Sequence, residues 1–388
     1  MDIVYAREDL PTSMNRSIFL AGPTPRSDTP VPSWRGEMIE RLRFLGFDGH
    51  IFIPEDRNGE WSKDNYDDQL EWEEAALKQA DCIIFWVPRD IKNKMPAFTT
   101  NDEWGAWKHS GKVVFGAPKG ADKVSYQQHY AKKLEVPLCD TLISTARAAM
   151  DMVGKGAYRT GGEVKVPLYI WKQESFQRWY MSQVEAGNEL VDANLLWQFT
   201  APKAKTMFCW VLQVAVYVAA EDRVKANEFV IGRPDISSVV LWHRAPTLHD
   251  TKVVLVREFR VTTRTEDGFL REFPGGSSTP FTDPEITALK ELKEEAGGFT
   301  LDPNRLIKHD SRQLFGTLSS VHAHVFSAEI TDKELEFFES QRGKAHGVKK
   351  DTERTFIEVT TVGELLEKPL SDWSSLGMVF AGLAQAMR

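Results

Sequence analysis

Three glutamates in the last third of the chain have a spacing that suits metal chemistry. Glu291, Glu294 and Glu295 stand at positions i, i+3 and i+4, so a helix places their carboxylates on one face. Like charges this close repel one another unless a cation lies between them, and Mg²⁺ prefers carboxylate oxygens as ligands. We therefore expect the three residues to bind Mg²⁺ for phosphate chemistry, with Mn²⁺ as the alternative ion. A solvated acidic helix face is the competing interpretation.

The segment that carries these glutamates resembles the Nudix box, in which a glycine-containing loop leads into a helix that ends in paired glutamates. The positions in register are Gly276, Glu291, Leu292, Glu294, Glu295 and Gly297. Thr282, Lys290 and Gly298 depart from the pattern, which has glutamate, arginine and an aliphatic residue there. The resemblance implies a Nudix hydrolase domain. Because lysine offers a point charge where arginine forms a bidentate fork, we expect Lys290 to affect the turnover rate of this domain more than its binding of metal.

The strands expected at 253–260 and 269–276 are similar to those of Nudix proteins that act on ADP-ribose and nucleotide sugars. By this resemblance, the candidates for substrate contact are Arg257, Arg271, Glu272, Gly275 and Gly276. Ordinary charges at strand ends are the alternative for the first three. A catalytic base outside the box is also expected, and Glu353 and Glu358 are the candidates.

Four segments in the first half of the chain resemble the nucleoside 2-deoxyribosyltransferase-like family. They are residues 18–26, 85–90, 95–105 and 161–168, within a similarity that covers roughly residues 15–195. In this family a glutamate at the start of a helix is the nucleophile, and Glu103 occupies its place. Glu73 and Asp81 match the positions of family aspartates, which makes both of them catalytic candidates.

Cleavage of an N-glycosidic bond explains why a carboxylate is needed there. The bond breaks with oxocarbenium character at the anomeric carbon, so a carboxylate beneath that carbon can attack and form a glycosyl-enzyme. We expect Glu103, near the amino end of a helix, to stay ionised, which suits a nucleophile. Ala97 replaces a family aspartate, and Asn101 or Asp102 is expected to compensate. The alternatives are a helix-end charge for Glu103 and a surface acid for Glu73.

Arginines follow two of the expected strands. Arg26 comes after the strand at 17–23 and Arg89 after the strand at 81–88, so both could reach one binding cleft beside Gly22. Two guanidiniums there would suit a 5′-phosphate or a diphosphate. If either is only a surface charge, a free nucleoside becomes the alternative substrate, and the sequence leaves this choice open.

Alternating strand and helix patterns over the first part of the chain predict a doubly wound parallel sheet in an α/β domain. The expected strands are 17–23, 49–54, 81–88 and 112–118, and the expected helices are 33–45, 66–80 and 101–109. The strands are apolar on both faces, as parallel strands between two helix layers are. Ligands bind at the carboxyl ends of such strands, so functional residues are expected just after Leu20, Pro54, Val87 and Phe115.

A polar break at 201–205 separates this pattern from longer, hairpin-like strands. The change predicts a second domain of the α+β class. We therefore place a nucleoside 2-deoxyribosyltransferase-like domain at 1–200 and a Nudix domain at 203–388.

Composition places the chain among ordinary globular proteins. It has 388 residues, enough for two or three domains, with a hydrophobic content of 42% and a net charge of −8. The acidic balance argues against a nucleic-acid polymer as the ligand. Three scattered cysteines, the lack of an apolar run of membrane-spanning length and the lack of an amino-terminal signal pattern lead us to expect a cytoplasmic protein without membrane contact.

The combined hypothesis is a bifunctional enzyme of nucleotide metabolism that acts on small-molecule nucleosides or nucleotides. Its first domain cleaves or transfers at an N-glycosidic bond through Glu103. Its second domain hydrolyses an ADP-ribose-like nucleoside diphosphate derivative with Mg²⁺. The alternative is a nucleotide-binding sensor or regulator with little turnover, with phage–host conflict as one setting. The resemblance to deoxyribosyltransferases also implies a homo-oligomer.

Overall fold

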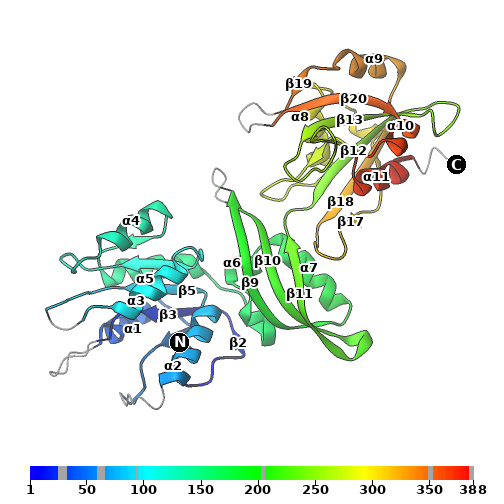
Figure 1. Ribbon diagram of the computed structural model, residues 1–388. Coiled ribbons are helices and arrows are strands. Elements are labelled where there is room, and N and C mark those ends of the chain that lie inside the picture. The colour runs from blue at the N-terminus through cyan, green and yellow to red at the C-terminus, as the bar shows by residue number, and fades with distance from the viewer. Residues whose placement is uncertain (25–32, 59–65, 93–94, 202–205, 348–352, 384–388) are drawn as a thin grey trace. The chain divides into compact units, whose positions relative to one another are not determined.

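The computed structural model describes residues 1–24, 33–58, 66–92, 95–201, 206–347 and 353–383. The chain divides into two compact units, which Figure 1 colours along the sequence. Unit 1 comprises Met1–Leu195 and Gln213–Glu228, and unit 2 comprises Leu196–Leu212 and Phe229–Arg388. No helix in the described ranges is long and apolar enough to cross a membrane.

A six-stranded parallel sheet forms the centre of unit 1. Its strand order is β1-β4-β3-β5-β6-β7, and every neighbouring pair runs parallel. The strands are β1 (Asp2–Tyr5), β3 (Ser17–Ala21), β4 (His50–Ile53), β5 (Cys82–Trp86), β6 (Val113–Gly116) and β7 (Leu138–Cys139). After β3 the chain moves outward to β4 and then returns past β3 to β5, so the strand order reverses there. Ligands of doubly wound sheets bind at this reversal, outside the carboxyl ends of the strands.

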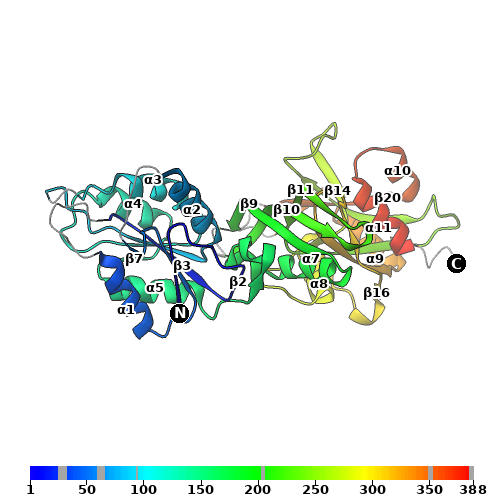
Figure 2. The ribbon, with the colours of Figure 1, turned by 90° about the horizontal axis from the view of Figure 1, so that it is seen from below.

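Helices cover both faces of this sheet, as Figure 2 shows: α2, α3 and α4 lie on one side, and α1 and α5 on the other. The helices are α1 (Trp34–Phe44), α2 (Tyr66–Gln79), α3 (Phe98–Trp107), α4 (Ser125–Lys133) and α5 (Leu142–Val153). Side chains alternate along each strand. In β5, Ile83 and Phe85 join the core beneath the first helix layer, whereas Cys82 and Ile84 join the core beneath the second. Burial on both faces explains the unbroken apolar runs in the sequence.

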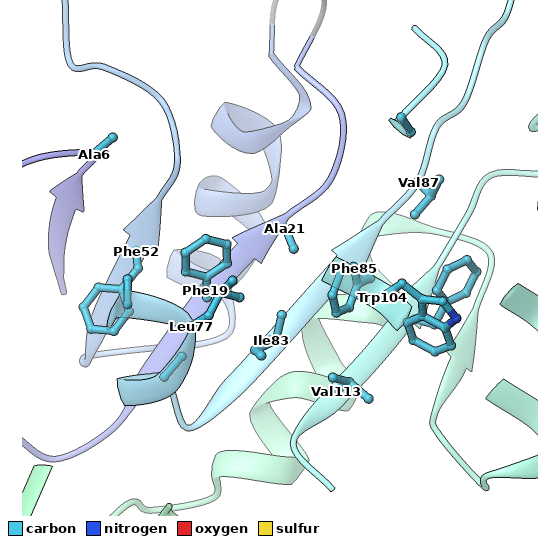
Figure 3. Close-up of a cluster of buried hydrophobic side chains, with 14 of the residues drawn as sticks. Ala6, Phe19, Ala21, Phe52, Leu77, Ile83, Phe85, Val87, Trp104 and Val113 are labelled. Carbon is cyan, nitrogen blue, oxygen red and sulfur yellow. The ribbon is translucent and has the colours of Figure 1, made fainter. Parts of the chain in front are cut away.

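Two tryptophans hold α2 and α3 against the sheet. Trp72 of α2 packs on Phe19 of β3, with 6.4 Å between ring centroids. Trp104 of α3 meets Phe85 and Phe115 edge to face at 5.4 and 5.0 Å, an arrangement that aromatic rings favour. Figure 3 shows Phe19, Phe85 and Trp104 in this buried layer. These contacts fix the helices that carry Glu73 and Glu103.

The expected parallel α/β arrangement of the N-terminal region is confirmed, with differences at its edges and in one helix. The short edge strands β1 and β7 were not predicted, because neither stands out as an apolar run. The helix expected from Asn101 begins at Phe98, after a left-handed Ala97 with a φ of 58°. Glu103 is therefore the sixth residue of α3 and lies in its second turn.

The rest of unit 1 leads into a second, smaller sheet. The elements in between are β2 (Ser13–Met14), which pairs with β8 (Arg159–Thr160), η2 (Gly161–Lys165), α6 (Leu168–Trp171) and α7 (Glu174–Glu185). Then β9 (Glu189–Ala201), β10 (Thr206–Val218), η3 (Ala219–Glu221) and β11 (Arg223–Gly232) follow, and the three strands form a sheet in the order β11-β10-β9. The division between the units falls inside this sheet. The polar break at 201–205 joins β9 to β10, and residues 202–205 of it lie outside the described residues.

Unit 2 is built on a mixed sheet of nine strands. Its main order is β16-β18-β12-β13-β20-β19, with β14 paired to β13, β15 to β12 and β17 to β18. β12 runs parallel to β18, whereas β13 runs antiparallel to both β12 and β20. The strands are β12 (Ile236–His243), β13 (Lys252–Phe259), β14 (Phe269–Glu272), β15 (Gly275–Gly276), β16 (Ile307–Lys308), β17 (Arg312–Gln313), β18 (His322–Glu329), β19 (Ala345–His346) and β20 (Thr355–Thr361).

Helices of unit 2 also pack on both faces of their sheet. They are α8 (Pro284–Glu295), α9 (Asp332–Ser340), α10 (Val362–Glu367) and α11 (Trp373–Leu383), with the short η4 (Pro303–Arg305). Val239 and Leu241 of β12 share a core with α8, and the intervening Val240 shares one with α11. The helix α8 ends before Gly297 and Gly298, whose φ angles of 70° and 81° suit glycine. This backbone requirement explains why a glycine, and not an aliphatic residue, stands at 298.

Candidate active sites

Glu73 lies on α2 at the carboxyl end of β4. Gln69, one turn earlier, donates from Nε2 to Glu73 Oε1 at 2.7 Å and to the Pro54 carbonyl at 3.4 Å. Pro54 directly follows β4, so the amide of Gln69 ties Glu73 to the sheet edge where ligands bind. Burial raises the pKa of the Glu73 carboxyl, against the opposing effects of the Gln69 hydrogen bond and the charge of Arg35.

Glu103 contributes a second carboxyl from α3, close enough for its charge state to depend on Glu73. Burial raises the pKa of Glu103 to about 8, the negative charge of Glu73 acts in the same direction, and Arg35 opposes it. The expectation that a helix start keeps Glu103 ionised is wrong, because the residue lies in the second turn of α3, where burial and the charge of Glu73 raise its pKa. Interacting carboxyls titrate as a pair, so the charge states of Glu73 and Glu103 depend on each other.

Arg35 supplies a positive charge to this pair from the first turn of α1. Its guanidinium is 2% exposed and donates to the carbonyls of Leu20 and Gly22 at 3.0 and 2.6 Å. It also donates to Glu55 Oε1 at 2.5 Å and to the Thr24 hydroxyl at 3.1 Å. Two of these partners stand at or just after the end of β3, and Glu55 follows β4. The arginine therefore occupies the reversal point of the sheet.

The other candidates of unit 1 surround this centre unevenly. Gly22 cannot carry a side chain, because a Cβ would lie 2.2 Å from the Trp86 carbonyl. Arg89 is buried and donates to the Lys123 carbonyl at 2.8 Å and to Asn101 Oδ1. Arg89 and Asn101 are thus bonded to each other, and Arg89 is also bonded to the loop before α4, so neither side chain is held towards a substrate by these contacts.

Two further candidates of unit 1 are placed only in part. Asp102 is exposed on α3. Arg26 lies outside the described residues. Of the two arginines expected from the sequence to bind phosphate, the structure therefore describes only Arg89, which is buried.

Asp81 directly precedes β5, so it lies at the amino ends of the strands, opposite the carboxyl ends that lead towards Glu73 and Glu103. Its carboxylate accepts from the backbone N–H of Ser17, the first residue of β3, at 2.9 Å. Arg159 donates to its two oxygens at 2.8 and 2.7 Å, and both side chains are fully buried. These contacts satisfy the carboxylate at the amino ends of β3 and β5, so they assign Asp81 to the fold and leave it out of our catalytic set.

A compact group of carboxylates forms the candidate site of unit 2. Oxygens of Glu258, Glu295 and Glu353 lie within 4.8 Å of one another. They come from β13, from the end of α8 and from the segment before β20. Burial raises the pKa of Glu258 and, well above its usual range, that of Glu295, and the neighbouring charge of Glu353 adds to both shifts. Like charges are thus held together here at an energetic cost that a bound cation would remove.

The three glutamates of the α8 motif do not contribute equally to this group. Glu295 belongs to it and accepts from the Gly275 N–H at 2.9 Å. Glu291 lies beside it, under the influence of Glu353, and its carboxyl carbon would be 2.8 Å from a Cβ at Gly276. Glu294 is more exposed and pairs with Lys290 at 3.4 Å. The three glutamates expected to bind the metal therefore do not form one group in the fold. The carboxylate oxygens that converge on Glu295 are those of Glu258 and Glu353, and Glu294 is not part of this group.

The candidate substrate residues of unit 2 form ion pairs around the same strands. Arg260 bridges Glu272 at 2.8 Å and Glu258 at 3.0 Å, which brings Glu272 to the edge of the acidic group. Arg257 and Arg271 both pair with Glu358, at 3.1 and 3.2 Å.

Aromatic and acidic neighbours complete these pairs. Arg257 lies between the rings of Phe269 and Phe356, at 4.7 and 5.0 Å from their centroids. Arg271 also pairs with Asp267 at 2.7 Å. Glu358 is thereby engaged with arginines, and Glu353 is the better placed of the two candidate bases.

Sequence reasoning missed Arg35, Glu55 and Glu258 as site residues. A signal existed for Glu55, because it follows Pro54 at the carboxyl end of a strand, where ligands bind. Arg35 gave no such signal, since its carbonyl partners are backbone atoms that no side-chain motif reveals. Glu258 is a strand residue that reaches α8 only through the packing of the sheet.

Comparison with known families gives a match for part of unit 1. Residues 15–121 match the family described as nucleoside 2-deoxyribosyltransferase like. The matched region spans β3 to β6 and contains Arg35, Glu55, Glu73 and Glu103. No curated protein matched the chain. The Nudix-like interpretation of unit 2 rests on its own residues and geometry.

Proposed function

We propose that unit 1 cleaves or transfers the N-glycosidic bond of a nucleoside or nucleotide, with Glu103 as the nucleophile and Glu73 as its acid and base. The observation that carries this proposal is a pair of half-buried carboxyls on α2 and α3 whose charges interact and whose pKa values are raised, inside the matched family region. Such a pair meets the requirement of glycoside chemistry for one proton donor and one carboxylate.

The proton count of the pair closes over a full cycle. Because the pKa of Glu103 is raised to about 8, we take the proton of the pair to pass from Glu103 to Glu73 when the substrate binds. In the productive form Glu103 is then ionised and Glu73 carries the proton. Glu103 attacks the anomeric carbon, the bond to the base breaks, and the base departs with the proton of Glu73. Water or an acceptor base then gives a proton to Glu73 while its oxygen or nitrogen bonds to the anomeric carbon, and Glu103 is released as a carboxylate. The pair again holds one proton.

Unit 2 is proposed to hydrolyse a nucleoside diphosphate derivative with Mg²⁺ or Mn²⁺. The residues fit a hard divalent cation, because oxygens of Glu258, Glu295 and Glu353 converge within 4.8 Å of one another and carboxylate oxygens are the ligands that such ions prefer. These three would hold the ion, with Glu291 beside them. A cation bound there would neutralise charge on the diphosphate and lower the pKa of water. Arg260, Arg257 and Arg271 supply positive charge for the rest of the substrate.

The two activities can be tested separately in the full chain. We would incubate the protein and Mg²⁺ with 2′-deoxynucleosides, NAD and ADP-ribose, and separate the products by chromatography. Glu103→Gln should abolish release of the base and leave formation of the nucleoside monophosphate unchanged. Glu295→Gln should have the opposite pattern. A variant that loses both products, while remaining folded, would contradict the assignment of one site to each unit.

A nucleotide-binding sensor is the second candidate function. Lys290, Thr282 and Ala97 favour it, since each stands where the resembled families have a charged functional residue. Binding of NAD or ADP-ribose by calorimetry, with no product from any of the substrates above, would select the sensor.

A further inference from the structure

Arg35 differs from the two other buried arginines of unit 1, Arg89 and Arg159, in which parts of the sheet its hydrogen bonds join. Arg159 pairs with Asp81 at the amino ends of the strands, and Arg89 donates hydrogen bonds to Asn101 and to the Lys123 carbonyl. Arg35 joins the end of β3 to the end of β4, through Leu20, Gly22 and Thr24 on one side and Glu55 on the other.

A short path of bonds connects this arginine to Glu73, one member of the carboxyl pair. Glu55 is the residue after Pro54, and the Pro54 carbonyl accepts from the same Gln69 amide that binds Glu73. Ser33, which caps α1, donates to Glu55 Oε1 at 2.9 Å. The ends of β3 and β4 and the starts of α1 and α2 are thus held in one network, with Arg35 as its only guanidinium among the described residues.

We propose that Arg35 is a positioning residue of the N-glycosidic site: it ties the ends of β3 and β4 to the starts of α1 and α2, and it supplies the counter-charge of the Glu73–Glu103 pair. The catalytic meaning of this inference rests on the proposed function of unit 1. The effect of the Arg35 charge on the titration of Glu73 and Glu103 can be measured in the protein without substrate. Without Arg35, the pair would take up its second proton at a higher pH, and the site would lose its nucleophile under neutral conditions.

The charges around the pair support this assignment. In the described part of the chain, Glu55 comes from the end of β4, Glu73 from α2, Asp102 and Glu103 from α3, and Arg35 from α1. Arg35 lowers the pKa of both Glu73 and Glu103, whereas Asp102 and the mutual repulsion of the pair raise that of Glu103.

The test must remove the charge of Arg35 without leaving Glu55 as an unpaired buried acid, because breaking one side of a buried ion pair is strongly destabilising. We would therefore compare Glu55→Gln with the double variant Arg35→Met/Glu55→Gln, in both of which residue 55 is neutral. Full-length protein labelled with ¹³C at glutamate carboxyls would be titrated by NMR from about pH 4 to about pH 9. Glu73→Gln and Glu103→Gln assign the two signals.

Loss of Arg35 in this background should raise the titration midpoints of the pair by about one pH unit or more, which is the order of the effect of one neighbouring opposite charge on a carboxyl. Arg35→Lys in the same background keeps the charge and should restore the midpoints. Arg41→Met is the matched control: Arg41 lies on the same helix, is exposed and pairs with Glu37 at 2.9 Å, so the pair should not respond. Midpoints within about 0.2 units of Glu55→Gln in the double variant would overturn the proposal.

Base release from 2′-deoxynucleosides separates this inference from the proposed function. Shifted midpoints without base release would retain the role of Arg35 and remove the N-glycosidic activity. Base release with unshifted midpoints would retain the activity and remove Arg35 from the site.

Discussion

The two candidate sites confine carboxylates in different ways. In unit 1 the pair of Glu73 and Glu103 is accompanied by Arg35 and can lower its repulsion by sharing one proton. In unit 2 the cluster of Glu258, Glu295 and Glu353 has Glu291 beside it, and Arg260 is already bonded to Glu258 and Glu272.

The difference indicates which chemistry each unit can perform. A carboxyl pair with a shared proton and an internal counter-ion is complete for acid–base and nucleophilic work. A group of acids with more negative charge than its arginine can offset needs an external cation. Unit 1 should therefore act without metal, and unit 2 should depend on it.

The largest effect is expected from the acids of unit 1. Glu103→Gln should lower the rate of base release by about 10³-fold or more, since it removes the attacking group. Glu73→Gln should do the same through loss of the proton. Glu74→Gln is the control, because Glu74 is exposed on the same helix and pairs with Lys78. Steady-state rates with a 2′-deoxynucleoside measure the effect, and an active Glu103→Gln protein would remove Glu103 from the mechanism.

Asp81 tests whether a buried carboxylate must be catalytic. Asp81→Asn should lower the free energy of unfolding by about 3–5 kcal/mol, because it leaves Arg159 buried without its charged partner. Asp48→Asn, which removes an exposed partner of Arg16, should cost less than about 1 kcal/mol. Urea denaturation gives both values. The rate per folded molecule should stay at the parent level in Asp81→Asn, and a loss like that of Glu103→Gln would return Asp81 to the catalytic set.

The glutamates of α8 should differ in their affinity for metal. Glu295→Gln should weaken Mn²⁺ or Mg²⁺ binding by about 100-fold, whereas Glu294→Gln should weaken it by less than about 10-fold, because Glu294 lies outside the closest group and is paired with Lys290. Titration calorimetry on the full chain measures both. Glu336→Gln, an exposed change on α9, is the control. Equal losses at Glu294 and Glu295 would restore the trio expected from sequence and refute the cluster seen in the fold.

The smallest effect concerns stability and pH. The folded-state pKa of Glu295 is raised, so its contribution to stability is full below the unfolded value near about 4.5 and is lost as the pH rises through the folded value. Without metal, the melting temperature of unit 2 should fall as the pH increases from about 5 to about 8. Mg²⁺ should raise the melting temperature by a larger amount at pH of about 8 than at pH of about 5, because the carboxylates that bind it are then ionised. Calorimetric scans on the parent and on Glu295→Gln would show this, and an equal gain from Mg²⁺ at both pH values would speak against the cluster as its binding site.

Much of the α/β sheet was predictable because its signals are local. Buried parallel strands are apolar on both faces, and Ile18, Ile51, Ile84 and Val114 stand in short runs bounded by turn residues. The edge strands β1 and β7 lack such runs. The start of α3 was missed because a left-handed residue at Ala97, and not a capping side chain, begins that helix.

The candidate sites were predictable only in part. Motif positions located Glu73, Glu103 and Glu295, because each stands on a helix with a recognisable spacing. The charged groups that surround them in the fold come from other elements: Arg35 from α1, and Glu353 from the segment before β20. Such partners are separated by long stretches of chain, so their proximity depends on the order of the strands.

The amino-acid sequence by itself determined which residue types could do chemistry, the parallel α/β class of the first part and the helices that carry the acids, because hydrophobic periodicity and motif spacing act over short distances along the chain. Tertiary structure alone decided that Asp81 closes a buried ion pair, that Glu294 lies apart from the tightest acid group and that Arg35 reaches the carboxyl pair. Charge states and ligand sets depend on burial and on distances between strands and helices, and those quantities exist only once the sheets have formed.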